Sequence, residues 1–216
     1  MSKKSYWDQF YTKKQADRSP SFDWFFSHDV ANQWLSKYIN QERSPNQVMN
    51  ILELGCGTSS LSSNLLKEVE DCRLISIDFS PSAVRQARAI SHEANTPSHL
   101  HDGSIQFLVA DATRLPFRNN QFDIVFEKGT LDAMLNTKNT ELARRAFSET
   151  VRVLTSGGIF LQFSDENPDL RLSFLEEALR QNNVDRGQMS VTYREIGTSF
   201  GTEYFLYITN FTNSSL

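Results

Sequence analysis

Hydrophobic residues along the chain alternate between two spacings. Short apolar runs that are typical of buried strands occur at residues 49–54, 73–79, 105–110, 122–127 and 158–163. Longer segments with apolar residues at helical spacing separate them, at 60–70, 82–94, 131–135, 140–154 and 169–181. Strands that alternate with helices in this order predict a parallel sheet covered by helices on both faces.

The last part of the chain follows a different pattern. Two strand-like runs, "SVTYREIG" and "EYFLYITN", are separated by a short gap that contains glycine, which predicts an antiparallel hairpin. We therefore expect an α/β protein with a single Rossmann-like, doubly wound sheet of seven strands, mostly parallel, with a C-terminal antiparallel hairpin. The length of 216 residues suits one such domain.

The N-terminal block, residues 6–39, is rich in Trp and Phe and predicts helices. We expect residues 1–45 to form a helical flank or lid on one compact unit, residues 46–216. Further along, Ser80 and Pro81 fit the N-cap and the first position of a helix. The Gly157-Gly158 pair fits a left-handed C-cap that stops the helix ending at Leu154.

Composition and charge narrow the range of partners. The formal net charge of −4 disfavours a nucleic acid as the main partner. Cys56 and Cys72 show no metal-binding spacing, and His92, His99 and His101 fall in one polar segment that we expect to be a solvated loop. We therefore predict no metal site and a reducing compartment.

Targeting and membrane signals are absent from the sequence as given. No apolar run reaches the length of a membrane span, so we predict no membrane association. The first residues, "MSKKSYWDQF", match neither a secretory signal nor an Arg-rich transit peptide. Either the protein is made without a presequence, or the presequence is missing from this chain.

The ends of the first two strands carry candidate chemistry, because open α/β sheets bind ligands at the carboxyl ends of their strands. Gly55 and Gly57 follow the first strand, but a dinucleotide-binding G-x-G-x-x-G would need glycine where Ser60 stands. Asp78 ends the next strand, where a carboxylate accepts hydrogen bonds from both hydroxyls of a ribose. This fits NAD and S-adenosylmethionine alike. A tight turn and a helix start without any ligand are the alternatives.

The third and fourth strands also end in polar residues. Asp111 can accept a hydrogen bond from the exocyclic amine of adenine, and Ala112 leaves room for the ring. The run from Glu127 to Asp132 directly follows "FDIVF", where the reacting end of a bound cofactor would lie. Any one of these could be a simple loop residue, but four ligand-like strand ends in sequence order favour a binding site.

Several stretches carry a family resemblance. "LELGCGTSSL", "IDFSP", "VADATRLPF", "FDIVFEKGTLDAML" and "VRVLTSGGIFLQF" together resemble the class I, seven-stranded S-adenosylmethionine-dependent methyltransferases. More narrowly, "YWDQFY", "FDWFF" and "EKGTLDA" resemble the branch of protein-lysine methyltransferases that modify translation elongation factor and citrate synthase. "SDENPDLRL" resembles the mitochondrial citrate synthase members. The resemblance covers nearly the whole chain. It implies methyl transfer from S-adenosylmethionine, leaving S-adenosylhomocysteine, to a lysine of citrate synthase in the mitochondrial matrix.

The resemblance also implies which residues hold the cofactor. Aromatic side chains of the N-terminal block close over it, which suits a sulfonium cation and a flat adenine ring. Without the resemblance they would be interpreted as core-filling residues of an amphipathic helix. The missing third glycine, at Ser60, is tolerated in this branch. The implied cofactor-binding residues are Trp7, Tyr11, Trp24, Gly55, Gly57, Asp78, Phe79, Asp111, Ala112 and Lys128.

Two carboxylates are the candidate catalytic residues, Glu127 and Asp132. A lysine has an unperturbed pKa of about 10.4 and must react as the neutral amine, so we expect them to orient the amine or accept its proton. Asp132 equally suits capping of the following helix. Asp165, Glu166 and Asp169 lie on the same edge of the sheet and would receive a lysine-bearing protein surface, unless they merely start a helix.

Other functions stay open at this point. A cytosolic lysine methyltransferase of translation elongation factor shares "YWDQ" and "EKGTLDA" and needs no presequence. A catalytically silent fold could serve as a cofactor-binding or partner module, although the intact set of strand-end residues argues against it. A small-molecule methyltransferase is disfavoured, because the chain has little extra sequence with which to enclose an acceptor.

Overall fold

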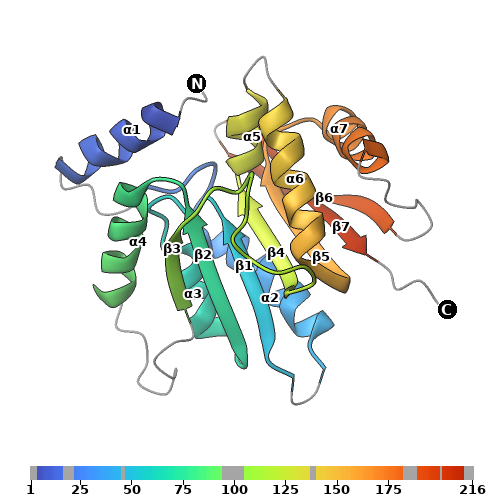
Figure 1. The fold of residues 1–216 in the computed structure, drawn as a ribbon, viewed down its shortest axis with the longest axis horizontal. Coiled ribbons are helices and arrows are strands. Elements are labelled where there is room, and N and C mark those ends of the chain that lie inside the picture. Colours follow the sequence, from blue (N-terminus) through green and yellow to red (C-terminus); the bar gives the residue numbers. More distant parts are fainter. Residues whose placement is uncertain are drawn as a thin grey trace.

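A seven-stranded mixed sheet forms the centre of this computed structural model, which describes residues 4–16, 22–44, 47–93, 105–136, 140–181, 189–199 and 201–211. The strands lie in the order β3-β2-β1-β4-β5-β7-β6 (Figure 1). β1 to β5 are parallel, and β7 lies antiparallel between β5 and β6. The predicted sheet with its C-terminal hairpin is confirmed. The strands are β1 Met49–Leu54, β2 Cys72–Asp78, β3 Ile105–Val109, β4 Phe122–Lys128, β5 Leu154–Ser164, β6 Met189–Ser199 and β7 Thr202–Phe211.

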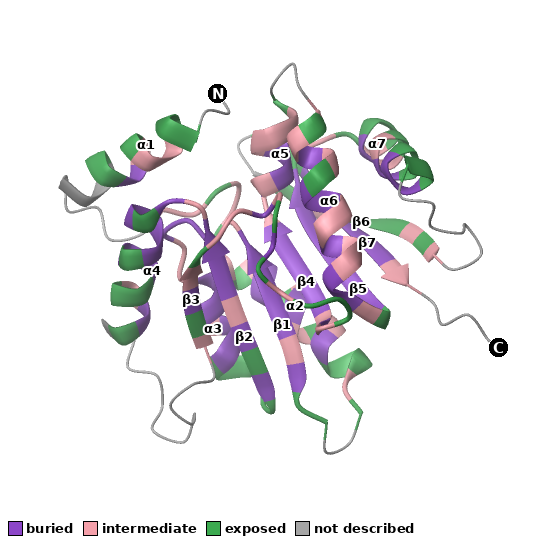
Figure 2. Cartoon of the chain, viewed as in Figure 1, coloured by how far each residue is buried: buried purple, intermediate pink, exposed green. Residues whose placement is uncertain are grey.

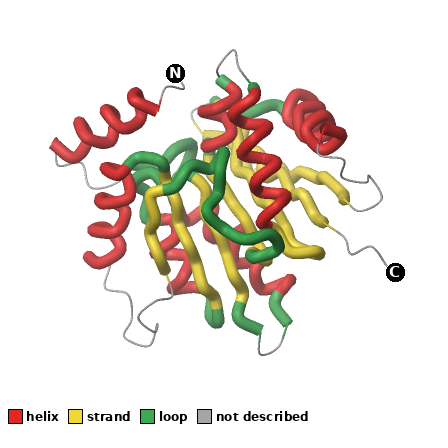
Figure 3. Tube along the Cα trace, in the orientation of Figure 1, coloured by secondary structure: helices red, strands yellow, loops and turns green. Residues whose placement is uncertain are grey.

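Helices cover both faces of this sheet (Figure 3). The helices among the described residues are α1 Lys4–Ala16, α2 His28–Glu42, α3 Leu61–Glu68, α4 Pro81–Glu93, α5 Thr130–Leu135, α6 Glu141–Val153 and α7 Pro168–Gln181. α2 and α3 pack on one face, and α5, α6 and α7 pack on the other. α4 packs against β3, and α1 lies against α4 at the end of the sheet toward which the parallel strands point (Figure 1).

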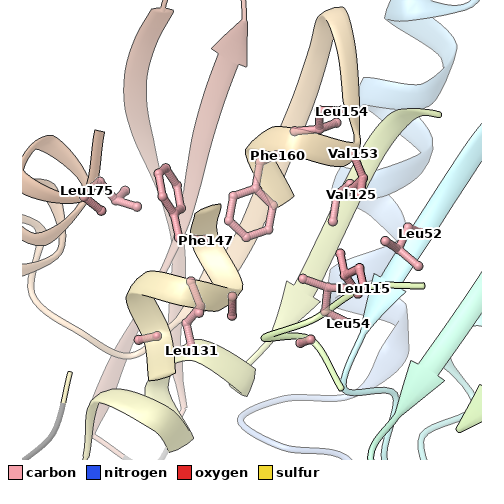
Figure 4. Packing of buried hydrophobic residues seen from close by; sticks show 14 of the residues in the cluster. Leu52, Leu54, Leu115, Val125, Leu131, Phe147, Val153, Leu154, Phe160 and Leu175 are labelled. Atoms are coloured by element: carbon pink, nitrogen blue, oxygen red, sulfur yellow. The ribbon is translucent and has the colours of Figure 1, made fainter. Parts of the chain in front are cut away.

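Large apolar side chains fill the layer between the sheet and α5–α7 (Figure 4). Phe147 of α6 packs on Phe160 of β5, with ring centroids 6.1 Å apart, and Leu131 and Leu175 belong to the same cluster. Burial of one such side chain contributes roughly 1.5–3 kcal/mol to folding. β1 and β4 are buried along most of their length (Figure 2). The core therefore fixes these strands up to the carboxyl ends that carry the candidate site.

The predicted helices and strands all occur, and most of their bounds shift by one or two residues. The helix start at Ser80-Pro81 is confirmed, because Ser80 Oγ accepts a hydrogen bond from the Ala83 N–H at 3.3 Å. The N-terminal block forms two helices, α1 and α2, with a non-helical segment at residues 22–27 between them.

The prediction for the Gly157-Gly158 pair is wrong. α6 already ends at Val153, and Leu154 is extended (φ −70°, ψ 140°), because its buried side chain starts β5 and pairs with Phe122. The glycines lie inside β5, where the pairing with β4 shifts in register, and Gly157 has a φ of +89°. A Cβ on Gly158 would come 3.0 Å from the backbone oxygen of Asp123. The pair therefore serves the close approach of two strands.

No helix in the described parts of the chain is long and apolar enough to cross a membrane. The predicted solvated loop is wrong for His92, which lies in the last turn of α4. His99 and His101 of that loop, and Ala94 at the end of a predicted helix, lie outside the described residues.

Candidate active site

One cavity lies at the carboxyl ends of β1 to β4, and α1 and residues 22–26 close its outer side. We call α1 together with residues 22–26 the lid. All cofactor-binding residues predicted from the sequence line this cavity. They are Trp7, Tyr11, Trp24, Gly55, Gly57, Asp78, Phe79, Asp111, Ala112 and Lys128.

The turn after β1 needs glycine at both predicted positions. Gly55 and Gly57 have positive φ angles of 68° and 54°, a conformation that other residues rarely adopt. A Cβ on Gly55 would overlap the side chain of Thr130, and one on Gly57 would lie 2.8 Å from the hydroxyl of Tyr11. Glycine therefore lets Thr130 and Tyr11 pack directly against this turn, and both glycines line the cavity with bare main chain.

Asp78 belongs both to the cavity wall and to a helix start. Its Oδ2 accepts a hydrogen bond from the Gly57 N–H at 3.0 Å, and its Oδ1 accepts one from the Ser80 N–H at 2.9 Å. Burial raises the pKa of Asp78 to about 6, against the opposing effect of these two donors. The carboxylate thus joins the glycine turn to α4, and the two interpretations of Asp78 from the sequence are compatible.

The Asp111 end of the cavity is tied to the lid. Lys4 of α1 forms an ion pair with the Asp111 carboxylate, and its Nζ lies 5.9 Å from the ring centroid of Phe79. Partial burial opposes ionisation, but hydrogen bonds from Lys4 and Thr113 together lower the pKa of Asp111. Lys4 also lines the cavity, and the sequence patterns considered above do not predict this.

Polar contacts also attach α1 to α4. Ser80 Oγ donates to Asp8 Oδ1 at 2.5 Å, and the hydroxyls of Thr12 and Ser82 lie 3.0 Å apart. Gln86 Nε2 donates to the backbone oxygen of Tyr11 at 2.9 Å. These contacts hold Trp7 and Tyr11 over the cavity, with their rings stacked at 6.1 Å.

Lys128 attaches the second part of the lid. Its buried Nζ donates to Asp23 Oδ1 at 2.9 Å and to the backbone oxygen of Phe26 at 3.0 Å. Burial lowers the pKa of Lys128, while Asp23 and Glu53 oppose this effect. Asp23 also accepts a hydrogen bond from Ser59 Oγ. Lys128 therefore forms the far wall of the cavity and pins residues 22–26 to the end of β4.

Glu53 is a lining residue that the sequence analysis missed. It is buried in β1, its Oε2 accepts a hydrogen bond from Ser62 Oγ at 2.5 Å, and burial raises its pKa. The signal was present in "ILELG", where a single acid interrupts an apolar strand. We call Asp23, Glu53 and Lys128 the front cluster, because all three are linked electrostatically beside the cavity.

The structure places the predicted catalytic carboxylates elsewhere. Neither Glu127 nor Asp132 is among the described residues that line the cavity. Glu127 Oε2 accepts hydrogen bonds from the N–H groups of Thr130 and Leu131, at 2.6 and 3.3 Å, and thereby holds the first turn of α5. Thr130 does line the cavity, so Glu127 reaches the site only through this turn.

Asp132 binds a fully buried arginine. Its Oδ1 accepts hydrogen bonds from Arg171 Nη2 and Ser164 Oγ, both at 2.5 Å, and the Arg171 guanidinium lies 5.8 Å from the ring centroid of Tyr207. The pKa of Glu127 is raised to about 8, mainly because the side chain is buried and further because the Asp132 carboxylate lies near it. We call Glu127, Asp132 and Arg171 the back cluster.

The acids that were predicted to receive the protein substrate lie near the surface. Asp165 and Asp169 are exposed, and Glu166 is half-buried.

Comparisons with known proteins show the family to which the chain belongs. A family model described as a methyltransferase domain matches residues 52–162. The mitochondrial citrate synthase-lysine N-methyltransferase of Danio rerio is 32% identical over 96% of this chain and 83% of its own length. That of Homo sapiens is 33% identical over 94% of this chain and 83% of its own length. The EEF1A lysine methyltransferase 4 of Mus musculus is 32% identical over 94% of this chain and 73% of its own length.

A solved structure shares the fold at low sequence identity. The N-methyltransferase NodS from Bradyrhizobium japonicum, in complex with S-adenosyl-L-homocysteine, has a TM-score of 0.59 and 17% identity. The match covers 84% of this chain and 87% of that one. This likeness supports the fold, whereas the curated relatives and the family model carry the family assignment.

Proposed function

This chain belongs to the family of S-adenosylmethionine-dependent methyltransferases, and we propose that it methylates a lysine side chain of citrate synthase. The observation that carries the proposal is the cavity at the strand ends, which is lined by every predicted cofactor-binding residue. The names of the relatives with 32–33% identity support the choice of citrate synthase.

The described residues fit the parts of the cofactor. Asp78 suits the two ribose hydroxyls, and Asp111 with Ala112 suits the adenine edge. The glycine turn offers bare main chain to the methionine part, and the buried carboxylate of Glu53 is a partner for its ammonium group. When bound, the cofactor supplies a methyl group on a positively charged sulfur, which the aromatic rings of the lid would stabilise.

The acceptor lysine must be aligned and neutral. Its nitrogen forms a bond to the methyl carbon as the sulfur–carbon bond breaks, and the amine proton leaves to water. Most of the gain comes from holding both groups in line, which is the task of the cavity walls. Burial in the site and the positive charge of the cofactor's sulfur both disfavour the ammonium form of the lysine, so they lower its pKa.

Glu127 and Asp132 act in this proposal as positioning residues. Glu127 fixes the turn that carries Gly129 and Thr130, and Asp132 ties the same helix to Arg171. Because both lie behind the cavity wall, their geometry favours a structural influence on the site over direct proton transfer. The exposed carboxylates of Asp165 and Asp169, next to Ser164 at the end of β5, would attract a lysine-bearing protein surface.

The second candidate substrate is translation elongation factor. It is favoured by the mouse elongation-factor methyltransferase, which is 32% identical over 94% of this chain. The two proposals imply different compartments: the citrate synthase relatives are named as mitochondrial, which supports the matrix, whereas elongation factor would place the protein in the cytosol.

Transfer of labelled methyl groups to purified citrate synthase and elongation factor, side by side, tests the function. We expect label on a lysine of citrate synthase. Label on elongation factor alone would replace the substrate, and label on neither would remove the proposed function. Asp78→Ala serves as the control, with cofactor binding measured by calorimetry. Loss of charge-assisted hydrogen bonds worth about 1.5–3 kcal/mol should weaken cofactor binding roughly 10- to 100-fold.

A further inference from the structure

We propose that Trp24 is the residue against which the acceptor lysine side chain lies, and that Trp7 forms the second wall of this acceptor channel. The proposal rests on the lysine methyltransferase function given above. It assigns to Trp24 a role toward the protein substrate in addition to its place in the cofactor cavity.

The position of Trp24 is the first observation that supports the proposal. The lid segment 22–26 is held to the end of β4 by Lys128, and Phe22 forms an isolated backbone bridge with Thr58. A Cβ on Gly129 would overlap the Trp24 indole, so the ring rests directly on the backbone that follows β4. Asp111 and Lys4 mark the other end of the cavity. Trp24 therefore lies at the reacting end.

The exposure of Trp24 carries the second step. Trp24 lines the cavity and, taken as a whole residue, is 36% exposed, whereas Tyr11 on the same lid is 9% exposed. A ring that only covered the cofactor would gain by full burial. A ring that reaches both the cavity and solvent instead offers a continuous surface from the outside of the molecule to the reacting end.

The arrangement of the two indoles carries the third step. The rings of Trp7 and Trp24 are nearly perpendicular, at 76°, with centroids 5.4 Å apart, so they present an aromatic corner. The face of an indole attracts ammonium and methylammonium groups. The lysine would arrive as the ammonium form, and its methylated products keep this attraction. The corner thus suits repeated transfer to one lysine.

Kinetics of Trp24 variants test the proposal. A cation–aromatic contact of about 0.5–2 kcal/mol corresponds to roughly a 2- to 30-fold change in binding. We expect Trp24→Ala to raise the KM for the protein substrate by that factor, and by more than it weakens the cofactor Kd. Trp24→Phe should recover most of the loss. Tyr6→Leu is the matched control, because Tyr6 is 39% exposed on α1 and contacts Trp7 but is not a lining residue.

Two results would overturn the proposal. One is a cofactor Kd that weakens with the protein KM unchanged, which would make Trp24 a wall of the cofactor site alone. The other is equal weakening of both, which would mean that the substitution releases the lid as a whole. The proposal also predicts fewer di- and trimethylated products for Trp24→Ala by mass spectrometry.

A second measurement does not depend on which protein is the substrate. In the protein loaded with S-adenosylhomocysteine, NMR spectra would follow the indole N–H signals of the three tryptophans during titration with an acetylated, amidated trimethyl-lysine. We expect a saturable shift of the Trp24 signal, assigned with Trp24→Phe, and a constant Trp34 signal. Trp34 on α2 faces Lys37 and is the internal control. An unmoved Trp24 signal would contradict the channel even if citrate synthase is methylated.

Discussion

Two buried charge clusters flank the end of β4, and they differ in what they face. The front cluster joins Lys128 to Asp23 and Glu53 beside the cavity. The back cluster joins Arg171 to Asp132 next to Glu127, away from the cavity. Glu127 and Lys128 are neighbours in one strand, and alternation along a strand sends their side chains to opposite faces of the sheet.

The difference shows that burial and a shifted pKa do not by themselves identify a reacting group. Glu127 has a pKa raised to about 8, but its environment is a helix start and an ion pair. Glu53 and Lys128 belong to the cavity wall, where a ligand can contact them. We therefore expect the back cluster to govern stability and the front cluster to govern binding.

The largest expected effect is on stability, from Arg171→Met. The substitution leaves the Asp132 carboxylate buried without its partner, which typically costs about 3–5 kcal/mol. Urea denaturation would measure the free energy of unfolding. The double variant Arg171→Met with Asp132→Asn removes both charges and should regain much of the loss. A loss below about 1 kcal/mol in the single variant would contradict the assigned role of the ion pair.

The matched change in the front cluster, Lys128→Met, should act mainly on binding. Asp23 is 21% exposed and can be hydrated when its partner is lost, so we expect a smaller destabilisation, about 1–2 kcal/mol. Release of the lid segment should weaken cofactor binding in calorimetry. If Lys128→Met destabilised the protein as much as Arg171→Met and left the cofactor Kd unchanged, the contrast between the clusters would fail.

The last expected effect concerns the pH dependence of stability. The pKa of Glu127 is about 8 in the folded protein, above its ordinary value of 4.5. Between these two pH values the folded protein therefore keeps a proton on Glu127 that the unfolded chain has released. This contribution to stability is complete below pH 4.5 and is lost as the pH rises toward 8. Asp78, with a pKa raised to about 6, acts in the same direction.

Glu127→Gln therefore should flatten the fall in thermal stability between pH 4.5 and 8, while leaving stability near pH 5 almost unchanged. Unfolding midpoints of both proteins across this range provide the measurement. Parallel curves for the two proteins would show that Glu127 does not carry the raised pKa.

The sequence predicted the site residues best where they stand at the ends of strands. Alternating strands and helices predicted the parallel sheet but not its strand order, and the strand ends bring Gly55, Asp78 and Asp111 to one edge. The pairing of Arg171 with Asp132 could not be predicted, because the two residues are 39 positions apart and "PDLRL" is also an ordinary exposed helix start. Glu127 and Lys128 were both predicted at the site, but alternation along β4 sends their side chains to opposite faces of the sheet.

The attachment of α1 to α4 bears on the order of events in one turnover. Asp8, Thr12 and the Tyr11 carbonyl hold α1 to α4 with three hydrogen bonds, and Lys4 fastens the same helix to Asp111. We expect a cofactor beneath this helix to exchange as these contacts open. We therefore expect a sequential kinetic scheme in which the cofactor binds first and its demethylated form departs last, with departure setting the turnover rate.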